Sequence, residues 1–301
     1  MQVLRTPDEA FADLVDYPFA PHWVEVADPD GGTLRVHHVD EGPRDGSVVV
    51  LLHGEPSWSY LYRHVIPPLV AAGHRVIAPD LVGFGRSDKP AEQSDYTYAR
   101  HVEWMRELLF DHLDLADVTL FAQDWGGLVG LRLVGEHPDR FARVVLGNTG
   151  LPTGEQQLSE ALQWWREYSR TCEVFATSQI INGATTRDLS PAEQAAYDAP
   201  FPDSSYQAGA RIFPSLIPVA PDDPGGPENR AAWASLATFE RPLLLAYSDQ
   251  DPMTGGADKP FRTIVPGAQG QPHRTIEGAG HFLQEDAPDQ VAQAILDAMA
   301  L

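Results

Sequence analysis

Residues 121–127 read FAQDWGG, and this stretch decides the fold. The apolar run that ends at Ala122 is typical of a buried strand, and the paired glycines after Trp125 precede a helical pattern. A sharp turn from strand to helix lifts one reactive side chain above the sheet. That side chain is Asp124, a carboxylate that is a weak nucleophile unless it is desolvated and aimed. We therefore expect Asp124 to attack a carbon that bears a leaving group, and to form an ester.

A second interpretation of Asp124 is purely structural. An aspartate just before a helix often caps that helix by accepting hydrogen bonds from its first free N–H groups. The catalytic interpretation makes further demands on the chain, because it needs a base, an acid that orients the base, and an oxyanion site. The rest of the sequence supplies a candidate for each of these groups.

Strands and helices alternate on both sides of the 121–127 turn. Short apolar runs predict strands, and apolar residues at helical spacing in 98–113 and 288–299 predict amphipathic helices. The predicted strands span 34–39, 47–52, 75–79, 118–122, 143–146, 242–247 and 273–276. This alternation predicts an α/β fold, with a mostly parallel central sheet flanked by helices.

The alternation stops after residue 150. Between 151 and 218 the chain shows helical patterns broken by proline and glycine, and 218–227 has the Pro/Asp/Gly composition of a linker. We therefore expect an inserted helical cap domain. The predicted core domain comprises 1–150 and 221–301, and the predicted cap domain comprises 151–220.

Candidates for the base and its acid follow the last two predicted strands. His281 lies in the loop after 273–276, and Asp251 lies in the loop after 242–247. An imidazole in that position can remove a proton from water, and a neighbouring carboxylate can orient it and stabilise its charged form. Asp249 is close enough in sequence to compete with Asp251 for this role, and an isolated loop histidine is more often solvated than catalytic.

The loop after the strand at 47–52 reads HGEP at 53–56. In this architecture, that loop supplies one N–H group of an oxyanion hole, and the residue after the nucleophile supplies the other. We therefore expect the backbone N–H groups of Glu55 and Trp125 to form the oxyanion hole. A Gly-x-Pro sequence also makes tight turns for structural reasons alone.

Taken together, these motifs resemble the α/β-hydrolase family, and within it the haloalkane dehalogenases. The similarity spans nearly the whole chain, and its specific matches are HGEPSWSYLYR at 53–63, DLVGFGRSDKP at 80–90, QDWGG at 123–127 and GHF at 280–282. They are most similar to the branch that carries Glu, rather than Asn, after the His-Gly pair. In that branch the acid follows the late strand as an Asp-Pro pair, which favours Asp251 over Asp249. The resemblance implies hydrolysis of carbon–halogen bonds in small halogenated aliphatic substrates by water, with release of halide, and with no cofactor and no metal.

Tryptophan side chains are suited to binding a halide as it leaves the substrate. An indole N–H donates a hydrogen bond without a full positive charge that would trap the anion. Trp125, next to the nucleophile, is the first candidate ligand. By resemblance, the second comes from the first cap helix, where the alignment favours Trp165 and leaves Trp164 as the alternative. Simple packing within the cap is the plain explanation for either residue.

Two other functions fit parts of the pattern. An epoxide hydrolase shares the fold and the Asp nucleophile but protonates its substrate with cap tyrosines, for which Tyr168, Tyr197 and Tyr206 are available. Against it, epoxide hydrolases usually carry an aromatic residue where this chain has Glu55. A binding protein that has lost catalysis is the other alternative, and the complete set of nucleophile, acid and base argues against it.

The amino-acid composition limits which partners the protein can bind. The 301 residues contain 21 Lys and Arg against 43 Asp and Glu, for a formal net charge of −22, so nucleic acid and anionic membranes are poor candidates. One cysteine, Cys172, excludes an internal disulfide and a Cys-rich zinc cluster. No stretch has the length of a signal peptide core or a membrane span, so we expect a cytoplasmic protein. The sequence does not specify an oligomeric state, and a monomer is favoured.

Overall fold

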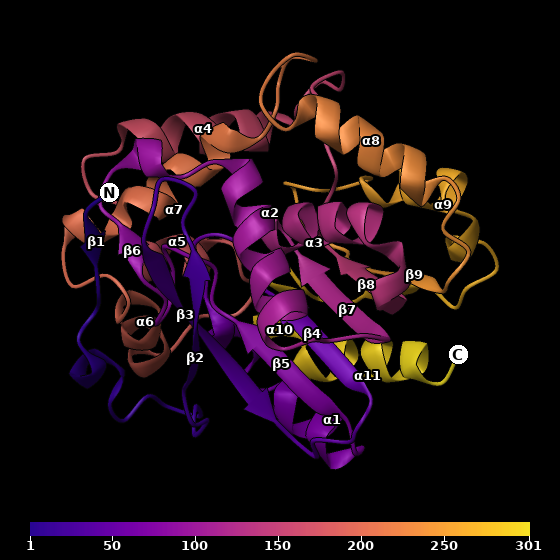
Figure 1. The fold of residues 1–301 in the computed structure, drawn as a ribbon, viewed down its shortest axis with the longest axis horizontal. Helices are drawn as coiled ribbons and strands as arrows, with labels where there is room; N and C mark the ends of the chain where they lie inside the picture. The colour runs from indigo at the N-terminus through magenta and orange to yellow at the C-terminus, as the bar shows by residue number, and fades with distance from the viewer.

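An eight-stranded sheet organises the fold (Figure 1), in a computed structural model that describes residues 1–301. Its strand order is β10-β9-β8-β7-β4-β5-β3-β2, and β1 and β6 form a separate two-stranded sheet. Neighbours from β10 to β5 are parallel, whereas β3 and β2 are antiparallel additions at one edge. The strands are β1 (Val3–Leu4), β2 (His22–Ala27), β3 (Thr33–Glu41), β4 (Val48–Leu52), β5 (Arg75–Pro79), β6 (Lys89–Pro90), β7 (Val118–Gln123), β8 (Phe141–Gly147), β9 (Leu243–Ser248) and β10 (Arg274–Ile276).

The middle of the sheet is its most buried part. Every residue of β7 is buried, and so is every residue of β4 after Val48. Each of these strands has parallel neighbours on both sides and helices on both faces, which is why their sequences are continuous apolar runs. The carboxyl end of β7, where Asp124 follows, is therefore anchored in the core.

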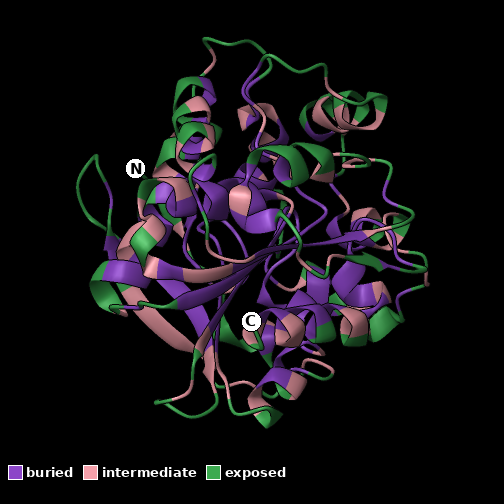
Figure 2. Cartoon of the chain, turned by 90° about the vertical axis from the view of Figure 1, so that its right-hand side faces the viewer, coloured by how far each residue is buried: buried purple, intermediate pink, exposed green.

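Helices cover both faces of the sheet, as the edge-on view in Figure 2 shows. Helices α2, α3 and α8 pack against one another on one face, and α1 packs with α11 on the other. The helices outside the predicted cap are α1 (Ile66–Ala71), α2 (Tyr98–Arg106), α3 (Trp125–Glu136), α8 (Gly226–Leu236), α9 (Asp258–Ile264), α10 (Leu283–Asp286) and α11 (Pro288–Met299). The predicted mostly parallel sheet flanked by helices is confirmed.

Between β8 and β9 the chain forms helices and no strand. Helices α4 (Glu160–Thr171), α5 (Thr177–Gly183), α6 (Pro191–Asp198) and α7 (Ala208–Ile212) come first, and α8 then returns to the face that carries α3. The division into a core and a cap at 151–220 stays a prediction. None of the helices has the length and apolar character that a membrane span requires.

Several local expectations differ from the structure. Strand β2 was not predicted, because only Val26 of its six residues is buried and the apolar signal is weak. Helix α8 begins at Gly226, inside the linker expected at 218–227. The helix expected at 98–113 is α2 followed by a wider helical turn at Glu107–His112.

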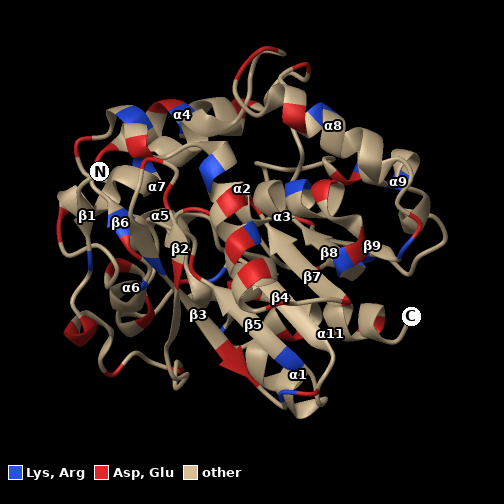
Figure 3. Ribbon diagram, viewed as in Figure 1, with Lys and Arg blue, Asp and Glu red and all other residues tan.

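Acidic side chains occur on elements throughout the molecule (Figure 3). Many are exposed and have no ion-pair partner, among them Glu9, Asp45 and Glu240. Like charges repel one another in the compact state, and dissolved salt screens this repulsion.

We predict that the free energy of unfolding rises by about 1 kcal/mol when ionic strength increases from about 0.01 M to about 0.15 M, as the screening length falls from about 30 Å to about 8 Å. Urea unfolding in potassium glutamate measures this without a halide that could bind the site. As a control, a variant with Glu9→Gln, Asp45→Asn and Glu240→Gln should gain less from salt. An equal gain in both proteins would mean that charge repulsion is not the cause.

Candidate functional site

Asp124 occupies the turn between β7 and α3, with φ 51° and ψ −127°. A positive φ is uncommon for a residue that has a side chain, and it marks local strain. The Asp124 side chain makes no capping hydrogen bond to α3. The interpretation of Asp124 as a helix N-cap is therefore wrong, and its carboxylate is free to face the loops above the sheet.

Backbone segments approach this turn so closely that only glycine fits beside it. A Cβ atom on Gly126 would lie 2.1 Å from the carbonyl oxygen of Leu52, and one on Gly54 would lie 2.4 Å from Oδ1 of Asp124. The first contact joins the start of α3 to the end of β4, and the second joins the HGEP loop to the Asp124 side chain. The glycines of both motifs thus set the distance between the carboxylate and its neighbours.

The HGEP loop supplies a hydrogen bond donor to Asp124. The backbone N–H of Glu55 donates to Oδ1 of Asp124 over 2.8 Å. Trp125 is the first residue of α3, and the N–H groups of a first helical turn have no partner within the helix. The predicted oxyanion donors therefore lie on the two segments that flank the carboxylate.

His281 connects Asp124 to Asp251. Its Nε2 lies 3.4 Å from Oδ2 of Asp124, and its Nδ1 lies 3.1 Å from Oδ2 of Asp251. Asp249 instead accepts the backbone N–H groups of Gly278 and Ala279, over 3.0 and 3.2 Å. The structure thus brings Asp251, rather than Asp249, to the histidine.

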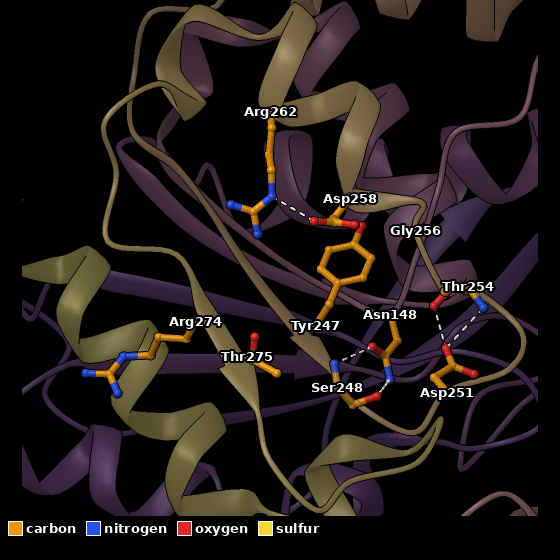
Figure 4. A pocket seen from close by; sticks show the side chains of 11 residues that line it. Asn148, Tyr247, Ser248, Asp251, Thr254, Gly256, Asp258, Arg262, Arg274 and Thr275 are labelled. Carbon is orange, nitrogen blue, oxygen red and sulfur yellow. Dashed lines mark hydrogen bonds and ion pairs between the residues drawn. The ribbon is translucent and has the colours of Figure 1, made fainter.

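The Asp251 carboxylate is held by its own loop. It accepts hydrogen bonds from the backbone N–H of Met253, over 2.8 Å, and from the hydroxyl of Thr254. Figure 4 shows Thr254 beside Asp251, in a small polar cavity of about 170 Å³ that also contains Asn148 and Ser248. Burial opposes ionisation, but His281 and these donors lower the pKa of Asp251 to about 2.

Two carboxylates act on His281. Burial by itself would lower its pKa, but Asp251 and Asp124 raise the pKa to about 10, from an ordinary value of 6.5. The imidazole is therefore protonated at neutral pH while Asp124 is charged. Any reaction that neutralises Asp124 removes one of the two negative charges, lowers the pKa of His281 and favours its neutral form, which can accept a proton.

A cavity of about 820 Å³ opens above these groups, between the sheet and helices α4 and α5. Asp124, Glu55 and His281 line its floor, and Trp165 lines its α4 side. Trp164 also reaches the cavity, but its side chain is 64% exposed and stacks on Tyr168. Of the two cap tryptophans, Trp165 is the more enclosed.

The indole of Trp125 has a different environment. It is 2% exposed and packs against the rings of Tyr98 and Phe213. It is not among the residues that line the 820 Å³ cavity. The structure thus brings Trp165 to the wall of the cavity, whereas the Trp125 ring packs mainly against Tyr98 and Phe213.

The Glu55 side chain was not singled out from the sequence, which assigned a role to its backbone only. It is 3% exposed, and its Oε1 has no hydrogen bond partner. Burial and the charge of Asp124 raise the pKa of Glu55 well above its ordinary value, while the Trp165 indole N–H acts in the opposite direction. This shift disfavours a second negative charge beside Asp124.

Sequence reasoning also missed two buried amides that hold the histidine. The amide nitrogen of Gln123 lies 3.2 Å from Nε2 of His281 and donates to its carbonyl oxygen. The amide of Asn148 donates to the carbonyl oxygens of Gly280 and His281 over 2.9 and 3.0 Å. The sequence signal that could have identified them is that each is a polar residue at the end of an apolar strand, β7 or β8.

Comparison with known proteins gives consistent matches. Residues 47–288 match the family described as the alpha/beta hydrolase fold. The chain is 56% identical to a haloalkane dehalogenase from Psychrobacter cryohalolentis, over 98% of this chain and 97% of that one. It is 53% identical to one from Mycobacterium marinum, over 98% and 99% of the two chains.

The structure resembles solved ones as well. The haloalkane dehalogenase DpaA from Paraglaciecola agarilytica NO2, described as tetrameric, matches with a TM-score of 0.91 at 35% identity. The match covers 100% of this chain and 98% of that chain.

The raised pKa of His281 predicts a pH-dependent contribution to stability. A group whose folded pKa is raised stabilises the protein fully below its unfolded pKa, here about 6.5, and loses this effect as the pH approaches about 10. We predict that wild type exceeds His281→Gln in free energy of unfolding by at least about 2 kcal/mol more at pH 6 than at pH 10. Urea unfolding across this range measures the difference. In an Asp124→Asn background the same difference should vanish at a lower pH, and a difference independent of pH would contradict the assignment.

Proposed function

Because the chain belongs to the haloalkane dehalogenase family of α/β-hydrolases, it is a hydrolase that converts haloalkanes to alcohols and halide, and we propose that Asp124, His281 and Asp251 carry out this reaction. One observation carries the proposal. The three side chains form a continuous line of contacts, at 3.4 and 3.1 Å, and Asp124 and His281 open onto the 820 Å³ cavity.

In the first step, a carboxylate oxygen of Asp124 attacks the carbon that bears the halogen. The new carbon–oxygen bond forms as the carbon–halogen bond breaks, and the halide leaves with the electron pair of that bond. The product is an alkyl ester of Asp124. The fixed position of the carboxylate, set by Gly54 and by the Glu55 N–H, supports this role because an aimed nucleophile loses little entropy on reaction.

In the second step, His281 removes a proton from water, and the resulting hydroxide attacks the ester carbonyl carbon. Ester formation has neutralised Asp124, so the pKa of His281 falls and the imidazolium releases its proton to solvent; the neutral imidazole can then take a proton from water. The backbone N–H groups of Glu55 and Trp125 stabilise the oxyanion. Collapse of the intermediate releases the alcohol and regenerates the Asp124 carboxylate, which restores the protonated His281 of the starting state.

The departing halide is held by the indole N–H groups of Trp165 and Trp125 in this proposal. The position of Trp165 on the wall of the cavity, close to Glu55, supports its part. The part of Trp125 rests on its place beside the nucleophile, since its ring is enclosed by Tyr98 and Phe213.

The epoxide hydrolase alternative is not favoured. The relatives at 53–56% identity are haloalkane dehalogenases. An epoxide hydrolase also needs tyrosine hydroxyls that face the substrate, and of the three cap tyrosines only Tyr168 lines the cavity. The hydroxyl of Tyr197 is buried and donates to Glu285 instead.

The substrate is a small halogenated aliphatic compound, and water is the second reactant. We propose that the reaction uses neither a cofactor nor a metal, and that the chain is a cytoplasmic monomer. Light scattering on the purified protein tests the monomer against the tetramer described for DpaA.

Replacing the base should stop the reaction halfway. We predict that His281→Phe forms the alkyl ester on Asp124 but hydrolyses it at least about 100-fold more slowly, because a general base contributes about that much or more. Intact mass after incubation with 1-bromobutane should show one added butyl group, and peptide mapping should locate it on Asp124. Asp124→Asn is the matched control without the nucleophile. No adduct on His281→Phe would contradict the proposed division of labour.

Halide binding should distinguish the two cap tryptophans. We predict that Trp165→Phe weakens bromide binding about tenfold, as expected for loss of one hydrogen bond to a charged group, and that Trp164→Phe changes it less than about twofold. Saturable quenching of tryptophan fluorescence by bromide gives the dissociation constants. The reverse order of effects would assign the halide ligand to Trp164.

A further inference from the structure

The loop that carries His281 is held by the core on one side. Its carbonyl groups at Gly280 and His281 accept hydrogen bonds from the Asn148 amide, and the Gly280 carbonyl also accepts one from the Ser248 hydroxyl, over 2.8 Å. Asp249 accepts the N–H groups at the start of the loop. These contacts leave the N–H groups of Gly280 and His281 to other partners.

Those other partners are Ala184, in the connection between α5 and α6, and Asp286, at the end of α10. The N–H of His281 donates to the carbonyl oxygen of Ala184 over 2.9 Å. The N–H of Gly280 donates to Oδ2 of Asp286 over 2.8 Å, while Oδ1 of Asp286 accepts the N–H groups of Thr186 and Arg187 over 2.9 and 3.2 Å. A single carboxylate thus joins the histidine loop to residues 184–187.

Packing and charge reinforce this junction. A Cβ atom on Gly280 would lie 2.6 Å from the Ala184 carbonyl oxygen, so the two backbones are in close contact. The Thr186 hydroxyl donates to the Gly278 carbonyl oxygen over 2.7 Å. The Arg187 guanidinium forms an ion pair with the buried Glu285 carboxylate and donates from Nε to the Glu285 carbonyl oxygen over 3.0 Å.

We propose that Asp286 is a positioning residue that, together with residues 184–187, holds His281 in place for ester hydrolysis and plays no part in ester formation. The proposal rests on the proposed function, in which the two steps use different side chains. Asp124 is aligned by the Glu55 N–H and by the Thr149 hydroxyl, which donates to the Asp124 carbonyl oxygen over 2.7 Å. No hydrogen bond connects Asp124 directly to Asp286 or to 184–187.

Because ester formation and ester hydrolysis use different side chains, the proposal predicts different effects on their two rates. A displacement of about 1 Å in a catalytic group can cost about 100-fold in rate. Loosening the junction moves the imidazole away from the water it must activate, while the nucleophile keeps its geometry. The ratio of the two rate constants should therefore change, which a general loss of stability would not produce.

Asp286→Asn is the first test. An asparagine oxygen can still accept the Thr186 and Arg187 N–H groups, but its NH₂ cannot accept the Gly280 N–H. In single-turnover experiments with 1-bromobutane, quenched rapidly and read by intact mass, the rate of ester hydrolysis should fall about tenfold or more, and ester formation should stay within about twofold. The ester should therefore accumulate to a higher level during turnover than in wild type.

Asp289→Asn is the matched control, because Asp289 is exposed and makes no side-chain hydrogen bond or ion pair. It should leave both rates unchanged. Thr186→Val removes only the hydroxyl bond to Gly278 and should lower the hydrolysis rate selectively, by a smaller factor. If Asp286→Asn does not fold, the Thr186→Val ratio decides the question.

The experiments distinguish a failure of the Asp286 positioning role from a failure of the proposed function. If His281→Phe accumulates ester but Asp286→Asn slows both steps equally or neither, the positioning role is overturned and the proposed function stands. If His281→Phe accumulates no ester, the proposed function itself fails. Selective slowing of hydrolysis in both Asp286→Asn and Thr186→Val supports the positioning role.

Discussion

The reactive geometry depends on how closely three backbone segments approach the turn at Asp124. The end of β4 contacts the start of α3 at Gly126, and the HGEP loop contacts the carboxylate itself at Gly54. Both distances are too short for any side chain. Because β4 and β7 are neighbouring buried strands, the sheet fixes these contacts, and it can hold Asp124 at a positive φ that would be costly in a flexible loop.

The position of the Asp124 carboxylate shifts the pKa values of the groups around it. A carboxylate beside His281 raises the pKa of the imidazole, and the same carboxylate raises the pKa of the buried Glu55. In the proposed mechanism, ester formation also removes the negative charge of Asp124. In the proposed mechanism, His281 is therefore protonated while Asp124 is charged and loses its proton when the ester forms.

The helices between β8 and β9 do more than cover the cavity. Helix α4 contributes Trp165 to its wall, and the connection between α5 and α6 supplies hydrogen bonds to the histidine loop. A buried ion-pair cluster extends this junction, because Glu285 pairs with Arg63 from the core and with Arg187 from the inserted helices. The same inserted segment thus lines the cavity and contacts the loop that carries His281.

The sequence by itself determined the alternation of strands and helices, apart from weakly apolar strands such as β2, and the turn at Asp124 with the candidates His281, Asp251 and Glu55. These signals lie in apolar periodicity and in short motifs that local chemistry constrains, whereas Trp165 came from the family resemblance. The tertiary structure decided which aspartate meets His281 and which of Trp164 and Trp165 is the more enclosed. It also revealed Gln123, Asn148 and Asp286, whose partners lie on other elements of the fold. A contact between residues far apart in the chain depends on how strands and helices pack, and no local pattern of residues encodes that packing.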